Sequence, residues 1–322
     1  MHRGIWARLG VMTAAGVLLG GMAVTLVVGP AYAGTLTVNC ATQNLQTAIN
    51  AAPSDSTILL SGTCINTTIS PAPNFTISKN LMLEGPAILE GTGSTGPVLT
   101  VSSATVSLTD LTIQNGDNSS TQGFGGGIYN TGNLILTKTT VSNNRVTGTS
   151  GSGGGIYNNG ALTLSSSIVE SNSVTDGDGG GILNGIGKSV TLESSVVENN
   201  GVKNSADLSG NGSGGGIGND INGLVILESS DVLGNSASSS GGGIGNAGGT
   251  VTLQSSIVAD NSVTDGDGGG IYNGVLDAGG TVTLDSSLVV FNRASGMGGG
   301  IYNNSGTVNT SDTFIFANFP GP

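Results

Sequence analysis

The chain has 322 residues, carries 20 acidic residues against 8 basic ones, and contains 58 glycines. The acidic excess argues against nucleic acid and anionic membranes as partners, because both attract basic proteins. The glycine content alone would suit a disordered chain, but apolar residues recur at regular positions and indicate an ordered repeat.

Residues 1–33 predict a secretory signal peptide. Two arginines precede an apolar stretch over 11–28, and Ala31-Tyr32-Ala33 forms a small-residue cleavage site. This order is typical of a cleaved leader, and the alternative is an uncleaved membrane anchor. Cleavage leaves residues 34–322 with six basic and 20 acidic residues, a net charge of −14, and no histidine. We therefore expect a secreted protein, extracellular or at the cell surface, with no membrane span after cleavage.

Residues 34–66 are expected to cap the N-terminal end of a single domain over 34–322. Asn44–Pro53 predicts a short helix, with a capping asparagine, one apolar face and a terminating proline. The chain has two cysteines, Cys40 and Cys64. Export favours a disulfide between them, and the alternative is two free buried thiols.

A six-residue segment, Gly-Gly-Gly-Ile-x-Asn, recurs along the rest of the chain and indicates stacked supersecondary units. The triple glycine suits a sharp corner where backbones approach closely. Its isoleucines are separated by 26 to 35 residues. The seven copies are Gly125–Asn130, Gly153–Asn158, Gly179–Asn184, Gly214–Asn219, Gly241–Asn246, Gly268–Asn273 and Gly298–Asn303.

Between the glycine segments, Leu and Val alternate with polar residues over short runs that turn residues interrupt. Three short strands per unit predict an all-β fold, a right-handed parallel β-helix. We expect roughly nine to ten coils over 67–318, followed by a tail over 319–322. Each unit also ends one strand with an asparagine, and stacked amides can hydrogen-bond from coil to coil. This predicted structural ladder is Asn144, Asn172, Asn200, Asn235, Asn261, Asn292 and Asn318.

The last predicted coil is rich in phenylalanine. Phe314, Phe316 and Phe319 are three of the six phenylalanines in the chain. Since the terminal coil of a β-helix exposes strand edges, we expect these rings to cover it. A docking edge for a partner is the alternative.

These repeats resemble those of the right-handed parallel β-helix proteins of the pectin-lyase-like superfamily, over nearly all of residues 35–318. The Gly-Gly-Gly-Ile and Val-x-x-Asn segments are similar to the Gly-Gly-Ala-Ile and Phe-x-x-Asn repeats of chlamydial polymorphic outer membrane proteins. The resemblance implies the architecture more than an activity, because this fold hosts lyases, hydrolases, adhesins and phage tailspikes.

Four tyrosines follow the isoleucine of the glycine segment and should therefore face outward. Tyrosines on adjacent coils can bind sugar rings or pack against each other. Leu183, Gly218 and Gly245 interrupt the column. The candidate ligand-binding tyrosines are Tyr129, Tyr157, Tyr272 and Tyr302.

Two identical Asp-Gly-Asp turns are candidate calcium ligands, because closely spaced carboxylates suit a hard cation. They contain Asp176 and Asp178 in one coil and Asp265 and Asp267 in another. The alternative is a plain polar turn, and we expect no cofactor to be required. The longest unit carries a further candidate pair at its insertion, Lys203 and Asp207.

Together these features predict a non-catalytic, adhesin-like scaffold that contacts polysaccharide or other cell-surface components. The alternative is a polysaccharide lyase or glycoside hydrolase. An enzyme would require at least two carboxylates, or a carboxylate and a base, that converge in a groove.

Overall fold

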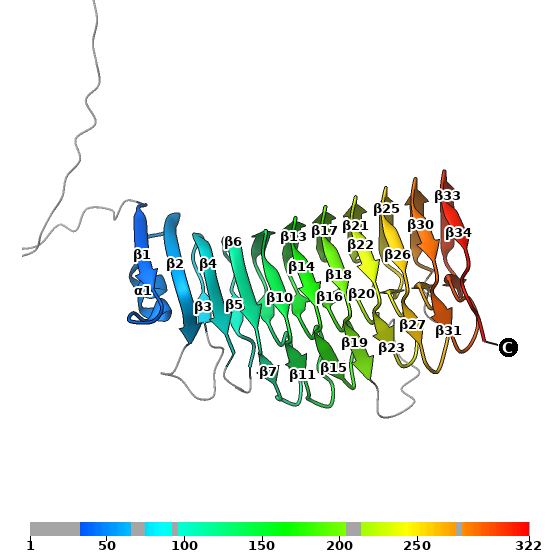
Figure 1. The fold of residues 1–322 in the computed structure, drawn as a ribbon, viewed down its shortest axis with the longest axis horizontal. Helices are drawn as coiled ribbons and strands as arrows, with labels where there is room; N and C mark the ends of the chain where they lie inside the picture. The colour runs from blue at the N-terminus through cyan, green and yellow to red at the C-terminus, as the bar shows by residue number, and fades with distance from the viewer. Residues whose placement is uncertain (1–32, 66–74, 92–95, 204–213, 275–278, 322) are drawn as a thin grey trace, which may run out of the picture. The chain divides into compact units, whose positions relative to one another are not determined.

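The computed structural model describes residues 33–65, 75–91, 96–203, 214–274 and 279–321. Within these ranges the chain winds into coils whose strands pair in parallel with the equivalent strands of the next coil (Figure 1). The predicted all-β parallel β-helix is therefore confirmed. The predicted signal peptide and Asp207 lie outside the described residues.

Each typical coil contributes strands to three sheets, which we call sheets A, B and C. In the described residues sheet B has nine strands, of which one lies in each successive coil. They are β3 (Phe75–Ile77), β5 (Leu99–Val101), β8 (Ile128–Asn130), β12 (Ile156–Asn158), β16 (Ile182–Asn184), β20 (Ile217–Asn219), β24 (Ile244–Asn246), β28 (Ile271–Asn273) and β32 (Ile301–Asn303).

Sheet C is the shortest sheet, with seven strands in the same part of the chain. They are β7 (Asp117–Asn118), β11 (Arg145–Val146), β15 (Ser173–Thr175), β19 (Gly201–Lys203), β23 (Ser236–Ala237), β27 (Ser262–Val263) and β31 (Arg293–Ala294).

Sheet A begins with one five-residue strand and three ten-residue strands, and each later coil adds two shorter strands. Its first members are β1 (Thr35–Asn39), β2 (Ser56–Ile65), β4 (Leu81–Glu90) and β6 (Thr105–Gln114). The paired strands that follow are β9 (Asn133–Thr137) with β10 (Thr140–Ser142), β13 (Ala161–Ser165) with β14 (Ile168–Glu170), β17 (Ser189–Glu193) with β18 (Val196–Glu198), β21 (Leu224–Glu228) with β22 (Asp231–Leu233), β25 (Thr250–Gln254) with β26 (Ile257–Ala259), β29 (Thr281–Asp285) with β30 (Leu288–Val290), and β33 (Thr307–Ser311) with β34 (Phe314–Phe316).

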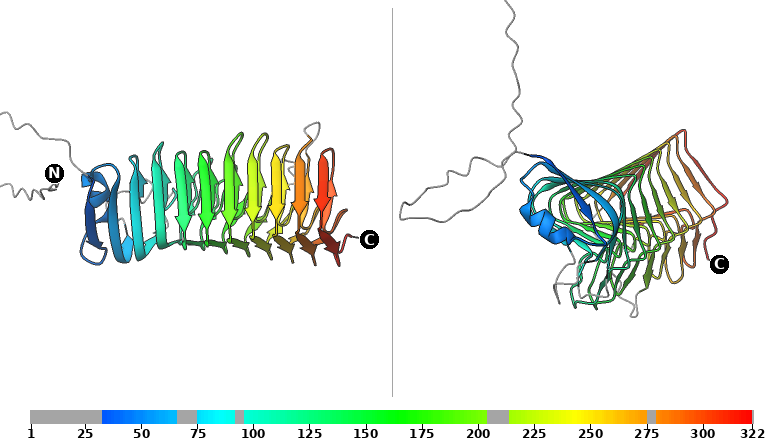
Figure 2. Two further views of the ribbon diagram at one scale, coloured as in Figure 1. Left: turned by 90° about the horizontal axis from the view of Figure 1, so that it is seen from above. Right: turned by 60° about the vertical axis from the view of Figure 1, so that its left-hand side comes forward.

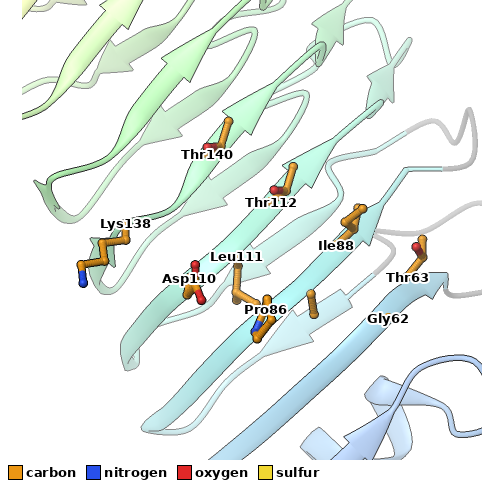
Figure 3. Close-up of a pocket in the computed structure, with 10 residues that line it drawn as sticks. Gly62, Thr63, Pro86, Ile88, Asp110, Leu111, Thr112, Lys138 and Thr140 are labelled. Carbon is orange, nitrogen blue, oxygen red and sulfur yellow. The ribbon is translucent and has the colours of Figure 1, made fainter.

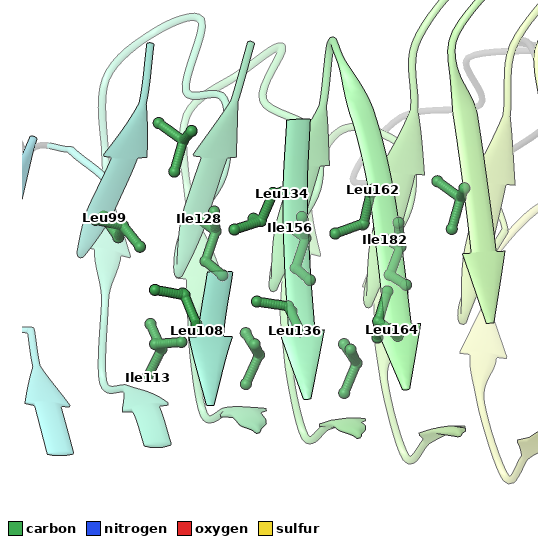
Figure 4. Packing of buried hydrophobic residues seen from close by; sticks show 14 of the residues in the cluster. Leu99, Leu108, Ile113, Ile128, Leu134, Leu136, Ile156, Leu162, Leu164 and Ile182 are labelled. Carbon is green, nitrogen blue, oxygen red and sulfur yellow. The ribbon is translucent and has the colours of Figure 1, made fainter. Parts of the chain in front are cut away.

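The core is a set of apolar columns that run along the coils. Leu108, Leu136 and Leu164 stack in one column and are fully buried, and isoleucines of sheet B lie across the interior from them (Figure 4). Burying one such side chain stabilises the fold by about 1.5–3 kcal/mol relative to leaving it exposed. The core is therefore continuous from coil to coil, because each coil repeats the same inward positions.

Buried polar side chains form a second kind of column. Each amide of the predicted asparagine column donates from its Nδ2 to the Oδ1 of the asparagine in the next coil, from Asn144 to Asn318, at 2.9–3.0 Å. Sheet B holds another ladder, which our sequence analysis did not assign, with amide contacts of 2.8–2.9 Å. It consists of Asn130, Asn158, Asn184, Asn219, Asn246, Asn273 and Asn303, the final residues of the seven glycine segments.

The triple glycines are needed where coils approach most closely. In the first copy Gly125 has φ of +72°, a conformation that disfavours any side chain. A Cβ added to the next glycine, Gly126, would lie 2.4 Å from the carbonyl oxygen of Gly154 in the following coil. The motif therefore allows the corners of neighbouring coils to stack and leaves no room for a side chain at Gly126.

The N-terminal end is covered by α1 (Leu45–Ala51), as predicted from its sequence. The Asn44 side chain accepts the Thr47 N–H at 2.9 Å, and Leu45 and Ile49 are buried. The Gln46 amide completes the edge of β3: its Oε1 accepts the Thr76 N–H at 2.8 Å and its Nε2 donates to the Thr76 carbonyl at 3.0 Å. The predicted Cys40–Cys64 disulfide is present.

The C-terminal end differs from our expectation. Phe314, Phe316 and Phe319 are 69%, 54% and 52% exposed, so the prediction that they cover the last coil is wrong. The reason is strand alternation: Ile315 pairs with Val289 and takes the inward position, which turns its two phenylalanine neighbours outward. Figure 2 shows α1 and the last strands at opposite ends of the solenoid.

No helix in the described part of the chain is long and apolar enough to cross a membrane.

Candidate functional site

The four candidate tyrosines lie on the strands of sheet B, at the position between the inward isoleucine and the inward asparagine. Tyr129 and Tyr157 are in register on adjacent coils, with ring centroids 5.7 Å apart. Tyr272 and Tyr302 form a second pair at 5.5 Å. The structure therefore gives two tyrosine pairs rather than one continuous column.

The interruption between the pairs is a local change in packing. The intervening register positions are Leu183, Gly218 and Gly245. A Cβ placed on Gly218 would lie 2.8 Å from Leu183 Cδ1, so the leucine side chain leans over the glycine. Leu183 is only 4% exposed despite its outward position.

Phe124 joins the first tyrosine pair and was not identified from the sequence. Its ring centroid lies 4.5 Å from that of Tyr157 and 6.2 Å from that of Tyr129. It occupies the position just before the triple glycine, where other coils carry Ser152 or Asp178. The signal in the sequence was that Phe124 is the one aromatic residue that precedes a triple glycine, since the other six copies follow Ser, Asp or Met.

Two carboxylates, Asp178 and Asp220, interact with each other, and Asp220 also interacts with Tyr157. Asp178 is followed by Gly179, which lies close to the next coil. A Cβ built on Gly218 of that coil would be 3.3 Å from the backbone nitrogen of Gly179. Asp220 follows β20, two residues beyond Gly218, and its charge interacts with both Asp178 and Tyr157. We call Phe124, Tyr129, Tyr157, Asp178 and Asp220 the aromatic–carboxylate face.

This packing changes the protonation of the face. Burial, followed by the charge of Asp220, raises the pKa of Asp178 to about 7. Burial also raises the pKa of Asp220, and burial together with the nearby Asp220 charge raises that of Tyr157. A carboxyl group with a pKa near 7 can donate a hydrogen bond in its neutral form and accept hydrogen bonds when ionised.

The two Asp-Gly-Asp turns have different surroundings although their sequences are identical. In the second turn the Asp267 carboxylate accepts the Met297 N–H at 2.6 Å, and the Asp265 N–H donates to the Ser238 carbonyl. In the first turn Asp178 belongs to the aromatic–carboxylate face, whereas Asp176 adopts a φ of +59°. Among the described residues no three His, Cys, Asp or Glu side chains form a metal-binding group. The calcium prediction gains no support from this geometry.

Lys203 ends β19 in sheet C and is exposed. It lies on a different sheet from the tyrosines, and its predicted partner Asp207 is outside the described residues. The Asp176 N–H donates to the Lys203 carbonyl at 3.1 Å, so the backbone of Lys203 lies beside the first Asp-Gly-Asp turn and away from the tyrosines.

A shallow hollow of about 380 Å³ lies elsewhere, on the outer side of sheet A (Figure 3). Thr63, Ile88, Thr112 and Thr140 line up across four coils along it. Lys138 and Asp110 lie near one another at one side, where both adopt positive φ at the bend of the sheet. The hollow has few functional groups and is separate from the aromatic–carboxylate face.

No model of a known protein family matches this chain, and no curated protein matches it. Among solved structures, the chain is similar to one described as the crystal structure of pectate lyase Pel9A, with a TM-score of 0.44 and 14% sequence identity. The match covers 89% of this chain and 79% of that one. A similarity at this level carries no argument about substrate or activity.

Proposed function

We propose that this protein is a secreted, adhesin-like scaffold that contacts polysaccharide through the aromatic–carboxylate face, without catalysis. The observation that carries the proposal is the grouping of Phe124, Tyr129 and Tyr157, with the charge of Asp220 acting on Tyr157 and on Asp178. Aromatic rings offer apolar faces against which sugar rings can stack, and carboxylates accept hydrogen bonds from sugar hydroxyls. The disulfide suits an oxidising, extracellular setting.

The charge of the face restricts the class of polysaccharide. Two carboxylates and the acidic excess of the whole chain would repel a polymer of uronic acids. A neutral glycan fits the rings and the hydrogen-bonding groups without this cost. We therefore expect neutral glycans to bind in preference to acidic ones.

A glycan array followed by titration calorimetry tests the proposal. Tyr157→Ala should weaken binding of a neutral glycan by about fivefold, since one aromatic contact contributes on the order of 1 kcal/mol. Tyr272→Ala is the matched control, because Tyr272 occupies the same position on β28, outside the aromatic–carboxylate face. Equal affinity of the Tyr157→Ala variant and the unmodified protein would contradict the proposed binding face.

Glycoside hydrolysis is the second candidate function, and one specific observation favours it. Asp178, whose pKa is near 7, lies close enough to Asp220 for their charges to interact. A protonated carboxyl and a second carboxylate are the two groups that glycosidases use. If the protein releases reducing ends from a neutral glycan, and both Asp178→Asn and Asp220→Asn abolish that release, the non-catalytic proposal is wrong.

A further inference from the structure

All four tyrosines of residues 34–322 lie in the two pairs described above. Tyr129 and Tyr157 are in register on β8 and β12, with ring centroids 5.7 Å apart. Tyr272 and Tyr302 are in register on β28 and β32, with ring centroids 5.5 Å apart. Paired strands lie about 4.8 Å apart, so two rings that leave the same face at the same register must meet. Each tyrosine is therefore held against one other tyrosine of the same chain.

Solvent can reach the phenol groups of both pairs. All four side chains are partly exposed, because the position between the inward isoleucine and the inward asparagine faces outward. The hydroxyl oxygen of Tyr272 accepts a hydrogen bond from the Asn304 amide at 3.3 Å, and its own hydrogen takes no part in that bond. An oxidant that removes one electron and one proton can therefore act on these phenols.

Such an oxidant has few other targets in this part of the chain. Residues 34–322 contain no tryptophan, and the two cysteines are joined in the Cys40–Cys64 disulfide, which suits an oxidising setting. Met82 and Met297 are exposed, but a methionine takes up oxygen as a sulfoxide and forms no cross-link. One-electron oxidation is therefore directed to the tyrosines.

We propose that each tyrosine pair is a site of oxidative cross-linking, in which a peroxidase and hydrogen peroxide join the two rings by a carbon–carbon bond. Each phenol gives up the hydrogen atom of its O–H group, and a ring carbon next to each C–O bond then bonds to its counterpart. The hydrogens that these two carbons carried move to the oxygens, so both phenols are restored. Hydrogen peroxide accepts the two hydrogen atoms that were removed and leaves as two molecules of water.

The links would tie β8 to β12 and β28 to β32 on the outer side of sheet B. Each closes a loop of about one coil, and a covalent link of this kind restricts the unfolded chain as a disulfide does. The linked protein should therefore unfold at a higher urea concentration than the unlinked protein. The proposal does not depend on glycan binding, because it requires only adjacent rings and an oxidant.

Treatment of the purified protein with a haem peroxidase and hydrogen peroxide, followed by proteolysis and mass spectrometry, tests the proposal. Two cross-linked peptides are expected, one that joins Tyr129 to Tyr157 and one that joins Tyr272 to Tyr302. On a denaturing gel the links should lie within single chains, and the urea midpoint should rise. Absence of both peptides, or links that form only between molecules, would overturn the proposal.

The matched control is the double variant Tyr157→Phe/Tyr302→Phe, which keeps an aromatic ring at all four positions and one tyrosine in each pair. Its remaining tyrosines, Tyr129 and Tyr272, lie on β8 and β28, five coils apart in sheet B, or about 24 Å. It should form no link within a chain, whereas Tyr157→Phe alone should lose only the first link. If the double variant forms as many links within single chains as the unmodified protein does, the assignment to adjacent pairs is wrong.

Discussion

The two described ends of the solenoid differ in how the interior of the terminal coil is covered. At the N-terminal end a helix covers the interior, the disulfide ties Cys40 to Cys64, and one glutamine side chain replaces a missing strand along β3. In the last described coil, at the other end, inward and outward apolar side chains such as Ile315 and Phe316 are exposed. The difference shows that an inner coil is covered by neighbouring coils on both sides, whereas a described end coil is covered by a neighbour on one side only.

In the asparagine ladder from Asn144 to Asn318, a residue in the middle should tolerate substitution far less than the last residue. Asn200 is buried and bonded on both sides, so Asn200→Leu removes the acceptor of the Asn172 backbone N–H and the side-chain donor to the Val169 carbonyl. It also removes one of the two acceptors of the Asn172 Nδ2. We expect the free energy of unfolding to fall by about 4 kcal/mol, from two or three unsatisfied groups. Asn318→Leu should cost about 1 kcal/mol, because Asn318 is only partly buried and water can reach the groups that it leaves. Equal losses in urea denaturation would contradict the comparison.

The N-terminal covalent link should be the next largest contribution. Replacing both Cys40 and Cys64 by serine removes a bridge across 24 residues and should lower the free energy of unfolding by about 3 kcal/mol in the chain-entropy model. Reducing the unmodified protein should reproduce this loss and leave the serine variant unchanged. A serine variant that unfolds at the same urea concentration as the disulfide form would show that the helix and core alone hold this end.

Asp178, in the middle of the solenoid, should make the free energy of unfolding depend on pH. Asp178 has a pKa of about 7 in the folded protein and about 3.9 when unfolded, so the folded state binds more protons between these values. Stability should therefore fall as the pH rises from about 4 to 7, by roughly 2 kcal/mol, because the carboxylate keeps some accessible surface. Asp178→Asn should flatten this part of the urea-midpoint profile. A profile identical to that of the unmodified protein would contradict the assignment.

The smallest expected effect is that of the glutamine at the N-terminal edge. Gln46→Ala removes both hydrogen bonds to Thr76 and should cost about 1 kcal/mol. Hydrogen exchange at the Thr76 amide is the direct measurement and should become faster. Gln254→Ala, an exposed position on β25, is the control and should leave that amide unchanged. Unchanged exchange in Gln46→Ala would mean that α1 protects the edge by coverage alone.

The architecture could be predicted from the repeat, because each coil carries apolar residues and an asparagine at the same positions. The second ladder escaped notice because its asparagines, such as Asn158, belong to a motif whose glycines explained the corner by themselves. Phe314 and Phe316 were misplaced because alternation on a terminal strand follows the neighbouring coil, in which Val289 is inward. The proximity of Asp178 and Asp220 could not be predicted, since they lie in different coils separated by the longest unit.

The matching register of neighbouring coils has a consequence for how such a molecule can change in length. Ile217 faces Ile244, and Ile244 faces Ile271, with the same asparagine contact at each junction. The coil is therefore a repeating unit whose junctions with the next coil are equivalent. A unit can be gained or lost by recombination within the gene while both flanking junctions keep their geometry. Such events would change the spacing between the two ends and leave each end as it is.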